Sequence, residues 1–233
     1  AVRPPTSLKV HKAIYGGKAS GHLWYKHIKA DLEGKDFIEC PSAKCLFIRP
    51  AKTTSNDPTI IFLHVDDGII LHNNQKVIDE TLEAIHKNLK LTKDAVNWHL
   101  GIKMEEKQNQ FKMSIPAYIE RLAIKYGLSE ANPKKTPMNP SVIHEANKGE
   151  PYKCPYQEAI GAILWAARVC RPDIMQGVAR LARYTANPSK THWMAVKRII
   201  QYLSTTKEKG LVYTRPTKKT SLMEVLRSAK IEI

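Results

Sequence analysis

Hydrophobic positions in the first third of the chain switch between helical and extended spacing. Residues 18–34 carry apolar side chains about one turn apart, which predicts a helix that Gly34 ends. Two short apolar runs, 37–40 and 45–48, lie on either side of Pro41-Ser42 and predict a pair of strands. The first third of the chain is therefore predicted to combine helix and sheet.

Residues 59–71, Thr-Ile-Ile-Phe-Leu-His-Val-Asp-Asp-Gly-Ile-Ile-Leu, form one of the most apolar runs and predict two further strands, 59–65 and 68–72. We expect the reversal at Asp67-Gly68, because glycine tolerates the positive φ of a tight hairpin turn. Residues 76–90 then place apolar side chains at spacings of 4, 3 and 4, which indicates an amphipathic helix. The runs 98–104 and 110–113 predict another hairpin.

Helical spacing dominates the second half. Ser114 is placed to cap a helix that runs through Tyr126 and ends at Gly127. Residues 131–153, rich in Pro, Asn and Lys, indicate a linker. Three helices are expected after the linker. They run over residues 155–169, from Pro172-Asp173 to before Asn187-Pro188, and from after Ser189 towards Gly210. One short strand, 211–213, follows them. The pattern as a whole predicts an α+β fold.

Composition narrows the class of protein. A hydrophobic content of 42% in 233 residues supports a buried core, and no apolar run approaches the length of about 18 residues expected of a membrane span. The net charge of +15 favours a polyanionic partner, nucleic acid ahead of an anionic membrane. A basic surface that is merely solvated is the alternative. The four cysteines form no C-x-x-C pair, which favours free thiols in a reducing compartment over structural zinc.

The adjacent carboxylates Asp66 and Asp67 allow two interpretations. Asp and Gly are common turn residues, so the doublet can be a simple chain reversal. Carboxylate oxygens also suit Mg²⁺, which typically takes one or two carboxylates together with substrate phosphates. Since neighbouring side chains on a strand point to opposite faces, the two could share a cation only where the chain bends. The residues alone leave both interpretations open.

Several short motifs accompany Val65-Asp66-Asp67 in a fixed order. They are residues 12–25 (KAIYGGKASGHLWY), Leu100-Gly101-Ile102, Tyr118-Ile119 through Thr136-Pro137-Met138, Tyr156, Gly161, Arg171-Pro172-Asp173-Ile174 and residues 195–203 (AVKRIIQYL). Together, over about residues 8–213, they resemble the reverse transcriptase of Ty1/copia-type retrotransposons. That family has a Val-Asp-Asp active-site turn, with Tyr commonest where this chain has His64.

The resemblance implies a palm-like antiparallel sheet with flanking helices, followed by a helical thumb and connection region. It implies a palm over residues 1–110, a thumb-like helix and linker over 111–150, a connection-like region over 151–213 and a divergent tail over 214–233. The implied activity is RNA-directed DNA polymerisation on an RNA template with a DNA primer, an RNA–DNA hybrid and dNTPs as partners, and no membrane. Location in the cytoplasm or in a virus-like particle is likewise implied.

The same resemblance assigns roles to individual residues. It makes Asp66 and Asp67 the catalytic ligands of Mg²⁺ or Mn²⁺, and it places Lys18, Tyr15 and Gly101 near template, primer or nucleotide. Each of these roles has an ordinary alternative. A single lysine in a basic chain, such as Lys18, is usually solvated. Trp24 and Tyr25 could stack on bases, although packing in the core is the commoner role of a tryptophan. Arg171 could be no more than a helix-entry residue beside Pro172.

Departures from the family pattern predict impaired activity. The family uses a third carboxylate on an earlier strand, and residues 1–11 contain no acid. Ala19 stands where the family has Gln beside the motif lysine, and an acidic opening of a ribonuclease H domain is lacking after Thr214. We therefore expect a partial polymerase without fingers and ribonuclease H regions. The alternatives are a non-catalytic nucleic-acid-binding remnant and a pseudogene product.

Overall fold

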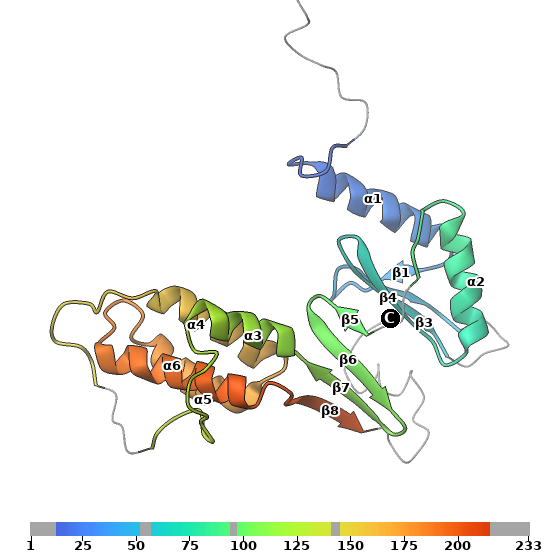
Figure 1. Cartoon of the computed structure of the whole chain (residues 1–233). Helices are drawn as coiled ribbons and strands as arrows, with labels where there is room; N and C mark the ends of the chain where they lie inside the picture. The colour runs from blue at the N-terminus through green and yellow to red at the C-terminus, as the bar shows by residue number, and fades with distance from the viewer. Residues whose placement is uncertain (1–12, 52–56, 94–96, 141–144, 215–233) are drawn as a thin grey trace, which may run out of the picture. The chain divides into compact units, whose positions relative to one another are not determined.

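The computed structural model describes residues 13–51, 57–93, 97–140 and 145–214 (Figure 1). These residues divide into two compact units, one up to residue 93 and one from residue 97 to 214. The expectations for residues 1–11 and for the tail beyond Thr214 lie outside the described residues. The fold is α+β, with two antiparallel sheets and six α-helices in the described parts.

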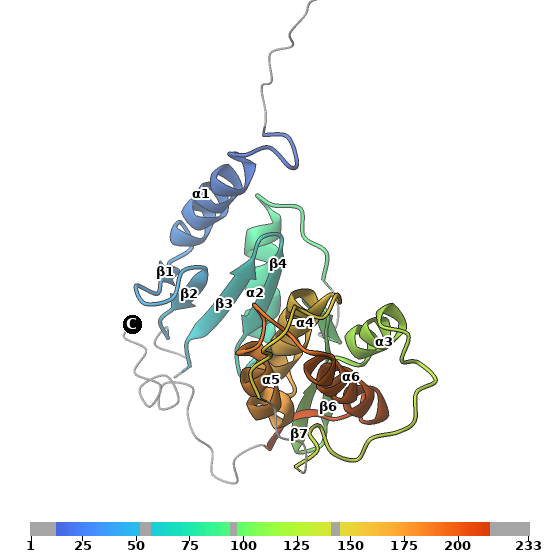
Figure 2. The ribbon, with the colours of Figure 1, turned by 90° about the vertical axis from the view of Figure 1, so that its left-hand side faces the viewer.

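The first unit is a four-stranded antiparallel sheet with two helices (Figure 2). The strands follow each other in chain order, so the sheet is a simple meander. Its elements are α1 (Ser20–Glu33), β1 (Ile38–Glu39), β2 (Leu46–Arg49), β3 (Thr59–His64), β4 (Asp67–Leu71) and α2 (Gln75–His86). The predicted strands 37–40 and 45–48 and the helix ending at Gly34 are confirmed within one or two residues.

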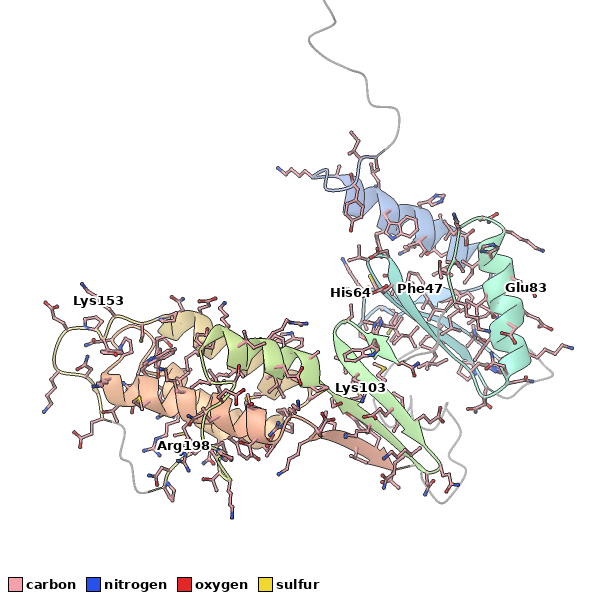
Figure 3. The ribbon with its side chains drawn as sticks, viewed as in Figure 1. Phe47, His64, Glu83, Lys103, Lys153 and Arg198 are labelled. Carbon is pink, nitrogen blue, oxygen red and sulfur yellow. The ribbon has the colours of Figure 1, made fainter. Side chains whose placement is uncertain are left out.

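Both helices pack on one face of this sheet. Phe47 and Ile61 are cross-strand partners, so their side chains share a face, and both are almost fully buried. Leu32 of α1 and Ile85 of α2 belong to the same core cluster. Figure 3 labels Phe47 among these side chains. The helix predicted over 76–90 ends at His86, although Leu89 beyond it is still buried in this core.

The second unit pairs a second four-stranded antiparallel sheet with a helical bundle. Its sheet runs in the order β5-β6-β7-β8, and its core is formed by the apolar faces of the helices. The elements are β5 (Trp98–His99), β6 (Ile102–Lys107), β7 (Gln110–Ser114), α3 (Pro116–Lys125), α4 (Tyr156–Val169), the 3₁₀ turn η1 (Pro172–Ile174), α5 (Met175–Ala182), α6 (Lys190–Thr205) and β8 (Gly210–Thr214). The predicted last strand thus exists and joins β7.

Arg171 is the largest fully buried side chain of the second unit. Its guanidinium makes two hydrogen bonds to the carboxylate of Asp173, at 2.9 and 2.8 Å, and two to Thr206 after the end of α6. The hydroxyl of Tyr202 donates to the same carboxylate at 2.7 Å. Arg171 therefore ties the start of η1 to the end of α6, which is more than the helix-entry role that its neighbour Pro172 indicates.

Several local predictions need correction. Ser114 does not cap α3: it is the last residue of β7, it is buried, and its hydroxyl has no hydrogen-bond partner among the residues that the structure describes. The run 98–104 is not one strand, because Leu100 and Gly101 form a tight turn between β5 and β6. The helix predicted from Pro172-Asp173 to before Asn187 starts as η1 and ends at Ala182. The start of α6 after Ser189 is confirmed, and there the structure shows a capping box between Ser189 and His192.

Candidate functional site

The turn of the β3–β4 hairpin carries the two carboxylates. His64 and Asp67 are cross-strand partners at the ends of β3 and β4, so the two-residue turn consists of Val65 and Asp66. The expected turn at Asp67-Gly68 is therefore wrong. Gly68 lies within β4 opposite Leu63, without a positive φ, and a Cβ atom there would come within 3.1 Å of the Leu63 side chain. The small size of Gly68 thus avoids a close approach to Leu63, and its place is in the strand and not in the turn.

This register separates the environments of the two acids. Asp66 lies where the chain bends, and Asp67 is the first residue of a strand. Both side chains are exposed. Asp67 shares its sheet face with its partner His64, and both lie on the face opposite the buried Ile61. The bend at Asp66 frees its carboxylate from the alternation that a strand would impose.

Val65 adopts an unfavourable backbone conformation in this turn. Its φ is 58°, a region that a β-branched residue enters rarely, whereas Asp66 has no positive φ. A positive φ at the first central residue only is the pattern of a type II′ turn, which normally has Gly at that position. Strain of this kind costs about 1–3 kcal/mol and tends to occur at functional sites.

A side chain from α1 holds the same turn. The indole nitrogen of Trp24 donates a hydrogen bond of 2.6 Å to the carbonyl oxygen of Val65. Trp24 is half-buried and its ring packs against the core of the first unit. The expectation that Trp24 packs in the core is confirmed, but the hydrogen bond to the turn could not be foreseen, because 41 residues separate the two partners.

Tyr15 and Lys18 precede α1 in a segment of tight turns. The amide of Gly17 and the hydroxyl of Ser20 both donate to the carbonyl of Ile14, at 2.9 and 2.5 Å. Tyr15 is 94% exposed and Lys18 is also exposed. Within the ranges described, neither makes a hydrogen bond or ion pair to Asp66 or Asp67. They are accessible, and the structure does not bring them into contact with the carboxylates.

Gly101 belongs to the second unit and therefore cannot be related to the carboxylate turn. Leu100 and Gly101 have φ values of 51° and 79°, and they link the partners His99 and Ile102. Positive φ at both central residues is the type I′ pattern, which matches the twist of the flanking strands. Glycine is required at this position by its backbone conformation.

A second group of polar side chains, which the sequence did not reveal, lies where α1 meets the β1–β2 turn. The carboxylate of Glu39 accepts hydrogen bonds from Tyr25 and Lys29, both at 2.6 Å, and from the amide of Cys45 at 3.0 Å. Burial opposes ionisation of Glu39, but these three donors outweigh it and lower its pKa to about 2. Tyr25 is therefore engaged within the fold.

The donor set at the turn fits a hard divalent cation. Two exposed carboxylates at a bend offer oxygen ligands of the kind that Mg²⁺ and Mn²⁺ prefer. In the described ranges, no three or more His, Cys, Asp or Glu side chains group together as a set of metal ligands. Any cation at Asp66 and Asp67 would thus take its remaining ligands from water, from substrate phosphates or from residues that are not described.

No helix within the described ranges has the length and apolar character needed to cross a membrane.

Comparison with known proteins identifies the family. Residues 3–140, more than half of the chain, match the family described as "Reverse transcriptase (RNA-dependent DNA polymerase)". No solved structure matches the chain.

Relatives come from transposons of plants and yeast. The chain is 29% identical, over 84% of its length, to the retrovirus-related Pol polyprotein from transposon TNT 1-94 of Nicotiana tabacum, and 28% identical, over 90%, to that from transposon RE2 of Arabidopsis thaliana. It is 26% identical, over 98%, to the transposon Ty1-BL Gag-Pol polyprotein of Saccharomyces cerevisiae. The chain spans only 14–15% of the length of these relatives. It contains a reverse transcriptase domain and belongs to the reverse transcriptase (RNA-dependent DNA polymerase) family of Ty1/copia-type transposons.

Proposed function

We propose that the β3–β4 turn is the metal-binding turn of an RNA-directed DNA polymerase, with Asp66 and Asp67 as ligands of Mg²⁺ or Mn²⁺. The observation that carries this proposal is the position of two adjacent, exposed carboxylates at the bend of a hairpin whose strands are anchored in a buried core. A rigid hairpin limits the positions that the ligands can take, which favours a cation of defined geometry.

In this proposal the chain's own residues bind and orient. When bound, a divalent cation would neutralise charge on the phosphates of an incoming dNTP. Asp66 and Asp67 would hold it at the hairpin tip, Lys18 and Tyr15 would contact template or nucleotide, and Gly101 would lie near the primer. The palm, thumb-like and connection-like assignments of residues 1–110, 111–150 and 151–213 belong to the same proposal.

We further propose that this chain, taken alone, polymerises poorly or not at all. Two carboxylates compensate two cations and a triphosphate less well than the three that the family uses. Ala19, where the family has Gln, also lacks the hydrogen-bonding amide.

Two measurements test these proposals. Mn²⁺ binding, followed by the loss of the free-ion electron paramagnetic resonance signal, should weaken strongly in Asp66→Asn and Asp67→Asn. Asp79→Asn is the matched control, since Asp79 is a half-exposed carboxylate in the same unit and pairs with Lys93. Unchanged Mn²⁺ affinity in both turn variants would contradict the metal site.

Primer extension on an RNA template, with Mg²⁺ or Mn²⁺, tests the second proposal. We expect no extension by this chain alone. Extension that Asp66→Asn abolishes would show that two carboxylates suffice.

A second candidate function is nucleic-acid binding without catalysis. Arg180 and Arg183 are three residues apart at the end of α5, so they share a face, and both are exposed. With Gln176, Ala179 and Tyr184 they line a shallow pocket. Exposed arginines that contact the phosphates of a nucleic acid give salt-dependent binding that does not require a metal ion.

A further inference from the structure

We propose that Trp24 is a positioning residue: its indole N–H fixes the direction of the Val65 carbonyl and thereby the direction in which Asp66 presents its carboxylate. This inference rests on the proposed role of Asp66 and Asp67 as metal ligands. It adds a residue that touches neither cation nor substrate but sets the geometry of the group that does.

The position of Trp24 follows from its place on α1. Trp24, Ile28 and Leu32 are four residues apart, so they lie on one face of the helix, and Ile28 and Leu32 are buried against the sheet. Trp24 lies eight residues before Leu32, about 12 Å along the helix. Val65 lies four residues beyond the buried Ile61, about 13 Å along the strand. Leu32 and Ile61 lie in the same core, and the distances from them to Trp24 and Val65 are nearly equal. Trp24 is therefore brought to the turn.

The hydrogen bond from Trp24 is to the peptide unit whose orientation decides the type of turn. Types I′ and II′ share a positive φ at the first central residue, and they differ by a flip of the peptide unit between the two central residues. In this hairpin that unit joins the carbonyl of Val65 to the amide of Asp66. The φ values, positive at Val65 and not at Asp66, follow the type II′ pattern, and the hydrogen bond of 2.6 Å from Trp24 holds the Val65 carbonyl in place.

Without that hydrogen bond, the flipped state is accessible. The positive φ of Val65, 58°, is already what a type I′ turn needs. The flip would then require a positive φ at Asp66, and Asp is among the residues that tolerate it best. Because the flip changes the backbone angle of Asp66, it changes the direction in which the Asp66 side chain leaves the turn.

Trp24 and Tyr25, which are adjacent in the motif, thus make different contacts. Trp24 donates to the turn, whereas the hydroxyl of the adjacent Tyr25 donates to Glu39 on β1. Trp24→Phe removes the indole donor and keeps an aromatic ring, and Tyr25→Phe removes a donor from the next position without touching the turn. The second variant is therefore a matched control for the first.

The first readout is independent of metal. The amide protons of Val65 and Asp66 are close together in a type I′ turn and apart in type II′, so a nuclear Overhauser effect between them reports the flip. We expect the effect to be weak in the original chain and in Tyr25→Phe, and strong in Trp24→Phe. A weak effect in Trp24→Phe would overturn the inference.

The second readout is Mn²⁺ affinity. Loss of one hydrogen bond should weaken binding roughly two- to tenfold in Trp24→Phe and leave Tyr25→Phe unchanged. Equal affinity in Trp24→Phe and the original chain would overturn the positioning role. If Trp24→Phe does not fold, benzothienylalanine in place of Trp24 keeps the bicyclic ring and lacks the N–H, and the same outcomes apply.

Failure of the proposed function gives a different result. In that case the original chain does not bind Mn²⁺ at this turn, or Asp66→Asn binds it equally well. A flip in Trp24→Phe would then show that Trp24 sets the turn, but the inference that it positions a metal ligand would be overturned with the site.

Discussion

His64 and Asp67 are cross-strand partners, so the whole reversal of the β3–β4 hairpin falls on Val65 and Asp66. One acid is thus fixed in the strand ladder and the other depends on the geometry of a two-residue turn. This difference makes the conformation of the turn, and the contacts that maintain it, central to any role of the pair.

Relief of the strain at Val65 should be measurable. Gly adopts a φ of 58° without a steric penalty, whereas with Ala the penalty remains. We expect Val65→Gly to be more stable than Val65→Ala by about 1 kcal/mol, even though glycine has the more flexible unfolded chain. Denaturant titration of the two variants checks this. Equal stability, or a more stable alanine variant, would show that the turn is not strained at this position.

Glu39 should make the first unit sensitive to acid. Its pKa is lowered to about 2 in the fold, from an ordinary value of 4.5, so its contribution is fully present above about pH 4.5 and is lost as the pH falls towards 2. Glu39→Gln should cost about 1–3 kcal/mol at neutral pH and remove that part of the pH dependence.

The control for Glu39 is Glu33→Gln. Glu33 approaches the same Lys29, at 3.7 Å, but half of its side chain is exposed. Denaturant titrations at pH 7 and pH 3 should show little change for this variant at either pH. An equal loss in both variants would mean that the network around Glu39 adds nothing specific.

Arg171 should be essential for the stability of the second unit. Arg171→Met fills much of the same volume but removes the hydrogen bonds that Arg171 donates to Asp173 and Thr206, and we expect a loss of about 2–4 kcal/mol. Arg168→Met, at an exposed position on α4, changes the charge equally and should have a small effect. Thermal unfolding of the two variants distinguishes a buried network from a general charge effect.

Arg180 and Arg183 should contribute to binding of RNA–DNA hybrid if the second candidate function holds. Replacing both with Gln should weaken binding at low salt, and each lost phosphate contact should reduce the slope of affinity against salt by about 0.7–0.9. Lys207→Gln is a suitable control, because Lys207 already pairs with Glu120. Binding isotherms at several salt concentrations that do not differ between the variants would exclude this face.

The sequence by itself determined the secondary structure wherever the apolar pattern was long or a specific residue marked an end. The strands 37–40 and 45–48 and the start of α6 after Ser189 were predicted within one or two residues. Periodicity and capping are local properties, so neighbouring residues carry the information. The family, too, was recognisable from short motifs in order, which the comparison confirmed.

Only the tertiary structure decided the register of the hairpin and the partners of its polar groups. Asp67-Gly68 has the composition of a turn, yet cross-strand pairing placed the reversal at Val65-Asp66 and used Gly68 for packing against Leu63. Trp24 and Val65, 41 residues apart, meet because a helix and a strand share one core. Hydrophobic spacing specifies which face is buried, but not which distant backbone atom a half-buried donor will reach, because that depends on how the elements pack.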